Sequence, residues 1–396
     1  MCTLKKYSLI TNLQIPKNYF VASLLFLLVF SYAFLPISYF FNSLYLIIFS
    51  FITLSFILFT ESKKSLANMD IFVWYLIFLV WYCVHLFFSG QLQIVQVDFR
   101  PIFFLNTATL FFCTYYSFLR EYVVKILFLA GIIYMSFSIS TFYSLISSNS
   151  VGGFVNIFVL SGLDDSGQDF YQNYGSWLAI LLIISAYFMN IFLNQKSKTK
   201  FLLFSIPFSF SLIFMLLLGA RGAFVGAIVG LIYLLRNIGF KNLFVSAILV
   251  SIFLIPLALF NQDILLTISR FSALLSGTDD SARLFMFSQA IDLWSQDMFT
   301  ILFGGGIKSY PIFIGENNLG WYPHNIFLEI LCELGIVGLL IFIRIFYSAF
   351  QNKKNDLLMT SLTLCMVLIY SFTGGMHDLY NIFFFLALSI KSNNDY

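Results

Sequence analysis

The sequence predicts an all-α polytopic membrane protein with about twelve transmembrane helices. Hydrophobic residues make up 60% of the 396-residue chain and charged residues only 10%, whereas a soluble domain carries about 25% charged residues. Apolar stretches also recur along the whole chain, and a helix needs about 20 apolar residues to cross a bilayer core. So little charge could not cover the surface of a soluble globule, and the membrane class follows.

The apolar stretches define twelve predicted spans. In chain order they are 18–35, 40–60, 70–88, 101–118, 122–146, 174–194, 201–219, 222–235, 242–260, 326–348, 357–372 and 379–390. The eighth and twelfth are short, which predicts tilted, kinked or partly re-entrant helices. The first follows Lys5, Lys6 and Lys17 without a small-residue cleavage site, so it is expected to be retained. No repeat or low-complexity linker divides residues 1–396, which predicts one integral membrane domain.

The basic residues orient these spans, because cytoplasmic loops carry an excess of Lys and Arg. With the N-terminus in the cytoplasm, the inner segments hold 16 of the 21 basic residues. This bias predicts an even number of spans with both termini cytoplasmic. The basic residues expected outside are Arg100, Arg221, Arg270, Arg283 and Lys308.

Residues 261–325 form the longest segment that cannot lie in a membrane, and they are predicted to be a periplasmic loop between late spans. Residues 262–275 are amphipathic. A second helix is expected after Asp279-Asp280-Ser281, because Asp and Ser accept the free N–H groups of a first turn. Both helices would lie along the membrane surface and roof a cavity. The expected apolar face of the second helix consists of Leu284, Phe287, Ile291 and Trp294.

Two outer arginines are candidate phosphate ligands, because a guanidinium binds phosphate through two parallel hydrogen bonds. Arg221 lies between two spans with glycines beside it, against the charge bias; the alternative is an arginine that snorkels to the interface. Arg283 is the second candidate, and its alternative is a surface ion pair with nearby aspartates. Arg270 and Lys308 are candidates for a supporting role.

His324 is the candidate catalytic residue, because a histidine that titrates near neutrality can accept a proton from a sugar hydroxyl. A lone histidine is more often structural, but its neighbours favour a site. Tyr322 and Asn325 flank it, and Glu329 lies inside the following span, where carboxylates are costly and usually functional or paired. His377 is expected on the same membrane face and is a further candidate for support.

Several classes of site are not indicated. The outer loops hold no Asp-x-Asp pair and no cysteine, and the chain has no Cys-x-x-Cys, phosphate-loop or nucleophile motif. No basic patch with interleaved aromatics suggests nucleic acid. The expected site therefore uses neither metal nor cofactor, and fixed cations would stabilise its leaving group.

Four motifs together resemble the bacterial O-antigen ligase/polymerase superfamily, over roughly residues 200–348 and in the topology of the whole chain. They are Gly-Ala-Arg-Gly-Ala at 219–223, Ser-Ala-Arg-Leu-Phe-Met at 281–286, Phe-Gly-Gly-Gly-Ile at 303–307, and Tyr-Pro-His-Asn-Ile-Phe-Leu-Glu-Ile-Leu-Cys-Glu-Leu-Gly-Ile-Val-Gly at 322–338. The resemblance implies an inner-membrane enzyme whose site faces the periplasm. It would move a glycan from undecaprenyl diphosphate to an acceptor hydroxyl by direct, inverting, metal-independent transfer. Arg221 and Arg283 would hold the diphosphate, and His324 would orient or deprotonate the acceptor.

The superfamily contains two activities. A polymerase joins lipid-linked repeat units, with membrane lipid and a chain-length regulator protein as expected partners, and a ligase moves the finished chain to lipid A–core. The Phe- and Asn-rich composition, with lysine favoured over arginine, is typical of AT-rich sugar-antigen gene clusters and favours the polymerase. A transporter or flippase is the alternative from another class; it would show midplane polar residues and repeat symmetry. A structural scaffold would not explain the outer arginines.

Overall fold

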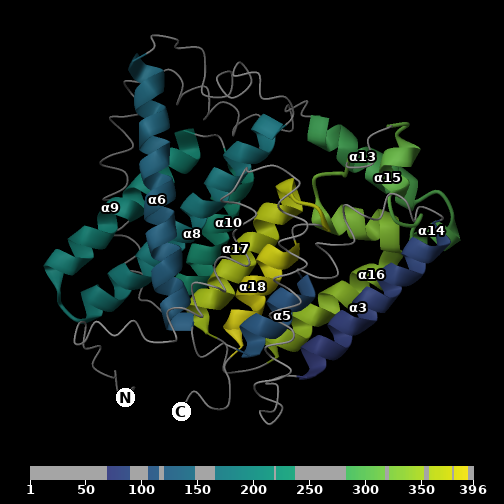
Figure 1. The fold of residues 1–396 in the computed structure, drawn as a ribbon, viewed down its shortest axis with the longest axis horizontal. Helices are drawn as coiled ribbons and strands as arrows, with labels where there is room; N and C mark the ends of the chain where they lie inside the picture. The colour runs from purple at the N-terminus through teal and green to yellow at the C-terminus, as the bar shows by residue number, and fades with distance from the viewer. Residues whose placement is uncertain are drawn as a thin grey trace.

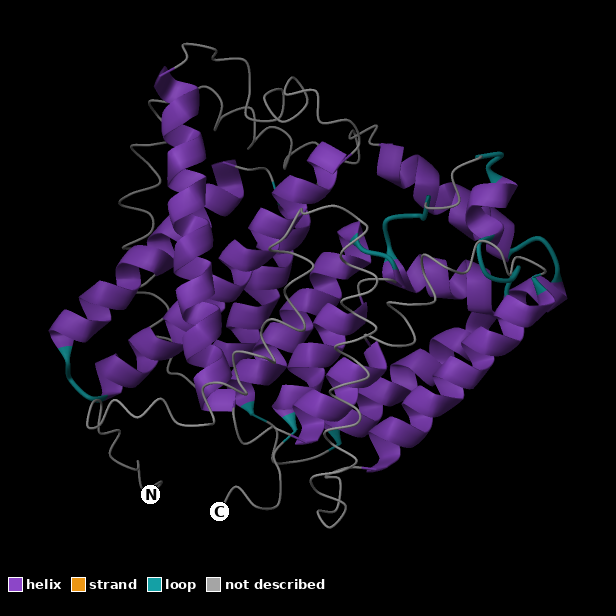
Figure 2. Ribbon diagram, in the orientation of Figure 1, coloured by secondary structure: helices purple, strands orange, loops and turns teal. Residues whose placement is uncertain are grey.

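The fold is known from a computed structural model that describes residues 69–89, 106–115, 120–147, 166–217, 220–236, 282–316, 321–351, 356–376 and 379–390. Within these residues every regular element is a helix (Figures 1 and 2). The helices are α3 (Met69–Phe88), α5 (Asn106–Tyr115), α6 (Arg120–Ser147), α8 (Ser166–Asn194), α9 (Lys198–Leu217), α10 (Arg221–Leu235), α13 (Ala282–Trp294), α14 (Met298–Phe303), α15 (Ser309–Phe313), α16 (Ile326–Phe350), α17 (Leu357–Thr373) and α18 (Leu379–Ser389).

Helices occupy nine of the twelve predicted ranges. The other three, 18–35, 40–60 and 242–260, lie outside the described residues. Four of the described helices are long and apolar enough to cross a membrane, namely α3, α8, α9 and α16. The chain is therefore a helical, membrane-embedded protein.

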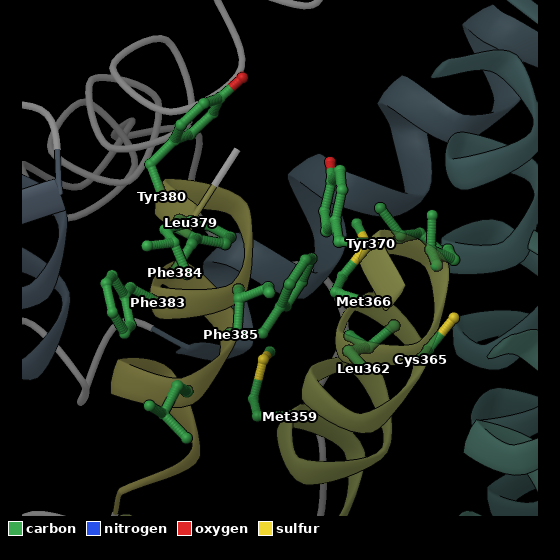
Figure 3. Close-up of a cluster of buried hydrophobic side chains, with 14 of the residues drawn as sticks. Met359, Leu362, Cys365, Met366, Tyr370, Leu379, Tyr380, Phe383, Phe384 and Phe385 are labelled. Carbon is green, nitrogen blue, oxygen red and sulfur yellow. The ribbon is translucent and has the colours of Figure 1, made fainter. Parts of the chain in front are cut away.

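The centre of the bundle is built on α17 and α18. Every residue of α18 is buried, which is the pattern of a helix surrounded by protein rather than by lipid or water. Figure 3 shows the apolar side chains of α17 and α18 gathered in one cluster. With 11 residues, α18 is shorter than the roughly 20 residues that usually cross a bilayer core.

A row of glycines brings α10 close to α17. Gly222, Gly226 and Gly230 recur every four residues on the buried face of α10. A Cβ added at Gly226 would lie 2.7 Å from the carbonyl oxygen of Cys365, so only glycine permits this approach. Small residues at this spacing allow close packing of membrane helices. The packing sets the first turn of α10, which begins at Arg221, beside the last turn of α17.

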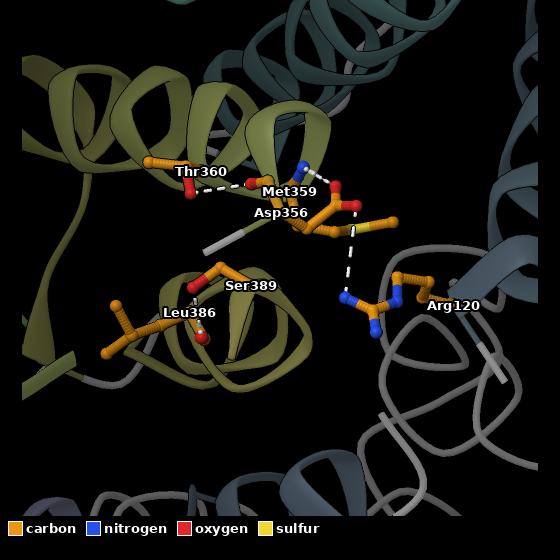
Figure 4. A network of polar contacts seen from close by, with 6 residues as sticks. All are labelled: Arg120, Asp356, Met359, Thr360, Leu386 and Ser389. Atoms are coloured by element: carbon orange, nitrogen blue, oxygen red, sulfur yellow. Dashed lines mark hydrogen bonds and ion pairs between the residues drawn. The ribbon is translucent and has the colours of Figure 1, made fainter. Parts of the chain in front are cut away.

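A polar network joins the opposite end of the bundle (Figure 4). Asp356 accepts a hydrogen bond from the Met359 amide at 3.0 Å and lies 3.8 Å from the Arg120 guanidinium. The Asp356 amide donates to the Ser389 carbonyl. The starts of α6 and α17 therefore meet the end of α18 at the end of the bundle away from Arg221.

Helix α16 is broken at Gly335, where φ is 69° and ψ is −172°. The carbonyls of the three residues before the break accept hydrogen bonds from donors outside the helix. Cys332 accepts from the Gly305 amide at 2.8 Å, Glu333 from the Gly306 amide at 3.1 Å, and Leu334 from the indole N–H of Trp81 at 3.1 Å. Backbone groups at membrane depth must find such partners within the protein. The glycine triplet at residues 304–306 and Trp81 of α3 thus supply the hydrogen-bond donors that stabilise the break.

We expect Gly304→Ala to destabilise the fold far more than Gly315→Ala. Both glycines have positive φ, at 81° and 74°, so a side chain at either costs about 1–3 kcal/mol in backbone strain. A Cβ at Gly304 would also overlap the backbone of Glu333, whereas a Cβ at Gly315 would meet nothing within 4 Å. Overpacking adds about 1–3 kcal/mol.

Thermal unfolding of the two purified variants in detergent measures this difference. A melting temperature that falls equally in both would show that the loop does not press against the break as described.

Candidate active site at the start of α16

The first half of α16 begins directly after His324. Asn325 is its N-cap, and the side-chain oxygen of Asn325 accepts hydrogen bonds from the Phe327 and Leu328 amides at 2.9 and 3.1 Å. Asn325 thus satisfies the first free backbone donors of the helix. Pro323 lies two residues before this cap. The ring of His324 lies against that of Tyr322, with centroids 4.4 Å apart.

His324 and Lys308 both adopt left-handed backbone, with φ of 51° and 63°. Among the described non-glycine residues only Lys196 shares this conformation. Each such residue costs about 1–3 kcal/mol and persists where the surroundings fix it, often at functional sites. The backbone at His324 is fixed by the helix cap at the next residue. The backbone near Lys308 is fixed by the hydrogen bond from the Gly306 amide to the Glu333 carbonyl.

Three charged side chains are buried within the part of the chain that the structure describes: Lys308, Glu329 and Glu333. All three lie in the first half of α16 or in the loop that contacts its break. Burying a charge is expensive unless it is paired or functional. Their gathering at one end of the bundle therefore marks this region as the candidate site.

Glu329 connects α16 to the turn after α17. Its carboxylate accepts a hydrogen bond from the Met376 amide at 2.6 Å, across 47 residues of sequence. The same turn follows Thr373, against whose side chain Gly222 of α10 packs. The end of α17 thus joins the first turn of α10, which carries Arg221, to the first turn of α16, which follows His324.

Arg283 lies in the first turn of α13, as predicted, and its side chain is half-buried. The packing of α13 against α15 and α16 begins one turn later, at Met286, and continues through Ala290, Leu293 and Trp294. Arg283 therefore precedes the part of α13 that is fixed to the rest of the site.

Most of the apolar residues predicted to share one face of this helix lie away from its contact with α16. Leu284 and Ile291 are 50% and 46% exposed, and Phe287 is only half-buried. The residues of α13 that pack toward α16 include Ala290, whose small side chain allows the helices to approach. Leu284, Phe285 and Ile291 are exposed instead, as are Met298 and Phe299 of α14. Trp294 is partly buried, and its indole N–H donates to the Ile301 carbonyl.

Tyr310 fixes α15 beneath α13. Its hydroxyl donates to the Met286 carbonyl at 3.4 Å and lies 3.5 Å from the Gln289 side-chain oxygen. Burial raises the pKa of Tyr310 to about 12, so the phenol remains a neutral donor at physiological pH. Asp297 caps α14, and the hydrogen bond from the Thr300 amide lowers the pKa of its carboxyl. Hydrogen bonds within the segment that carries Arg283 and Lys308 thus fix its short helices to one another.

Two predicted site residues, Arg270 and His377, lie outside the described residues, as does the helix expected at 262–275. Two residues that the sequence did not single out as site members are placed at the helix break, Glu333 and Trp81. A tryptophan inside an apolar span was the available signal, because a buried indole N–H usually has a partner. Among the described residues, no group of three or more His, Cys, Asp or Glu side chains is arranged to hold a metal ion.

Residues 206–343, from α9 to α16, match the family described as O-Antigen ligase. The chain carries a domain of the O-antigen ligase/polymerase superfamily. This O-antigen ligase domain contains Arg221, Arg283, Lys308 and His324, and excludes Trp81 and the turn at Met376. No curated protein and no solved structure matches the chain.

We expect Glu329→Ala to lower stability while Glu329→Gln retains most of it. Alanine leaves the buried Met376 amide without this acceptor, at a cost of about 1–3 kcal/mol. Glutamine keeps an oxygen at the same position. Melting temperatures in detergent measure the effect, with Glu316→Ala as the control because Glu316 is exposed. Equal stability of the alanine and glutamine variants would contradict a role for this hydrogen bond.

Proposed function

We propose that the protein is a membrane glycosyltransferase of surface polysaccharide assembly, an O-antigen polymerase that joins undecaprenyl-diphosphate-linked repeat units. The observation that carries the proposal is the position of the O-antigen ligase domain. Its motif residue Arg221 begins α10, and its motif residue His324 directly precedes α16 at the same end of the bundle. The end of α17 and the turn after it join these two helices.

The proposed reaction is a single displacement. The acceptor hydroxyl oxygen attacks the anomeric carbon of the donor sugar, and the bond from that carbon to the diphosphate oxygen breaks. The electron pair of the broken bond leaves with the lipid diphosphate, whose charge Arg221 and Arg283 stabilise. His324 takes the proton of the acceptor hydroxyl. One displacement inverts the configuration at the anomeric carbon.

The charge distribution along the bundle supports a site on the periplasmic face. Arg120 lies at the end of the bundle opposite Arg221, and Arg236 ends the helix that Arg221 begins. Arg344 lies 5.4 Å from the ring of Trp74, near the start of α3, while the end of α3 meets the glycine triplet. Basic residues mark the cytoplasmic side of membrane proteins. In our proposal the described helices belong to a twelve-span topology with both termini in the cytoplasm.

The segment 282–316 supports a periplasmic loop that rests on the membrane. Its outward side carries exposed apolar side chains from three short helices, including Phe285, Met298 and Phe313. Such a surface suits the interface between headgroups and acyl chains. The loop 261–325 would then cover the site from outside and leave the lipid donor a lateral approach.

A second candidate function is transfer of the finished glycan to lipid A–core, which the description of the matched family favours. The two activities differ in the acceptor that receives the glycan. The composition of the chain, rich in Phe and Asn and with lysine favoured over arginine, favours polymerisation.

A deletion strain separates the two activities by its surface glycan ladder on a gel. Core that carries a single repeat unit is the expected result, because ligation survives when polymerisation is lost. Bare core with long lipid-linked chains would show that the protein is the ligase. A ladder of normal spacing and amount would reject both.

A further inference from the structure

Trp81 is attached to the break in α16 by its indole N–H, which donates to the Leu334 carbonyl at 3.1 Å. The two residues are 253 positions apart in the chain, and Leu334 directly precedes the break at Gly335. An unsatisfied carbonyl inside a membrane costs several kcal/mol in general, so the break depends on this donor as well as on the glycine amides.

The surroundings of Trp81 are shaped for its ring. A Cβ added at Gly338 would lie 3.2 Å from the indole nitrogen, so glycine leaves the space that the ring fills against α16. The ring centroid lies 4.8 Å from that of His85 and 6.1 Å from that of Phe303, the residue before the glycine triplet. Trp81 on α3 therefore contacts both α16 and the end of α14.

We propose that Trp81 is a positioning residue for the transfer, acting through α16 rather than by touching substrate. This inference rests on the proposed function. The first half of α16 follows His324 and carries Glu329, and its direction is set at the break that Trp81 stabilises. The loop at the same break continues into Lys308. Removing the indole N–H shifts this half-helix, and small displacements of reacting groups slow catalysis strongly.

The test replaces only the indole N–H group of Trp81. In the full chain, Trp81 is exchanged for 3-benzothienylalanine, an isostere in which sulfur replaces the N–H, and in a parallel sample for 5-fluorotryptophan, which keeps the N–H. Both proteins are reconstituted in vesicles and supplied with a lipid-diphosphate oligosaccharide. We expect kcat to fall about 10- to 100-fold with the sulfur isostere, with KM for the donor unchanged, and to stay at the wild-type value with 5-fluorotryptophan. Equal rates for the two proteins would overturn the proposal.

A second measurement does not depend on activity. Trp81→Phe is compared with Trp74→Phe, the same change on the same helix beside Arg344 at the other end of α3. Cys332, whose carbonyl lies at the break, has a fully buried thiol. Maleimide labelling is followed in a chain with Cys2 and Cys83 replaced by serine. We expect labelling of Cys332 to rise in the Trp81 variant only.

The two measurements keep this inference separate from the proposed function. A wild-type protein that transfers no sugar would count against the proposed function, and the labelling would still show whether Trp81 holds the break. Equal protection of Cys332 in the Trp81 and Trp74 variants would overturn the inference even where the wild type is active.

Discussion

Replacing His324 by asparagine is expected to abolish glycan transfer while the chain still inserts and folds. Asparagine tolerates left-handed backbone, and His324 has a φ of 51°. The variant therefore keeps the turn before α16 but loses the imidazole that would accept the acceptor's proton. A positioned general base contributes about 10²–10⁴-fold to a rate. Transfer by purified protein from a lipid-diphosphate donor measures the loss.

Lys196→Asn is the matched control, because Lys196 has a φ of 57° and lies in the turn between α8 and α9 at the opposite end of the bundle. It makes the same kind of substitution in the same backbone conformation, away from the candidate site. Normal transfer by the His324 variant would remove this residue from the mechanism. A loss shared by both variants would point to folding rather than chemistry.

Arg221→Lys is the second change with a large expected effect. Lysine retains the positive charge, but its single ammonium cannot form the paired hydrogen bonds of a guanidinium. If Arg221 holds the departing diphosphate, the rate of transfer should fall roughly 100- to 1,000-fold, as for the loss of one charge-stabilising donor in other transfer enzymes. Stability should change little, because the half-exposed side chain stands at the first position of α10.

Arg236→Lys tests whether the arginine's position decides the effect. Arg236 is the C-cap of the same helix and lies over the ring of Tyr233 at 3.9 Å. We expect this variant to transfer at the normal rate. Arg221→Lys with full activity would show that charge alone suffices at that position, and would contradict bidentate binding of a phosphate.

The positions of the helices were largely predictable because long apolar helices are visible in the sequence as runs of hydrophobic residues. The start of α16 was clear from the polar residues before an apolar run, and the helix begins at Ile326, the first residue of the predicted span. The start of α8 was not clear: the helix begins at Ser166, well before the predicted residue 174. Polar residues there mask the helical signal that hydropathy detects.

The break in α16 was not predictable from the sequence. Gly335 stands inside an apolar span, two residues after Glu333, and a single glycine inside a helix is usually tolerated without a break. What stabilises the break is a set of donors from α3 and from the loop, and no local pattern reveals a partner 253 residues away. The face of α13 that packs toward α16 was not predictable for the same reason, because the partner helices decide which residues of α13 they contact.

The candidate site was predictable in its residue types but not in its connections. His324, Arg221 and Glu329 stood out as polar groups in an apolar chain. The link from Glu329 to the Met376 amide, and from Gly222 to Thr373, depends on how α17 packs between two helices. Hydropathy carries no information about such packing.

The order of the contacts around α16 has a consequence for synthesis on the ribosome. Trp81, Gly305 and Gly306 all leave the ribosome before Leu334, so the donors at the break are already made when their acceptors emerge. The Met376 amide follows Glu329 by 47 residues. A nascent chain that ends shortly after α16 would therefore already contain the donors for its break, whereas the carboxylate of Glu329 would still await this partner. The turn after α17 is thus made later than these helices and completes the hydrogen bonds of the candidate site.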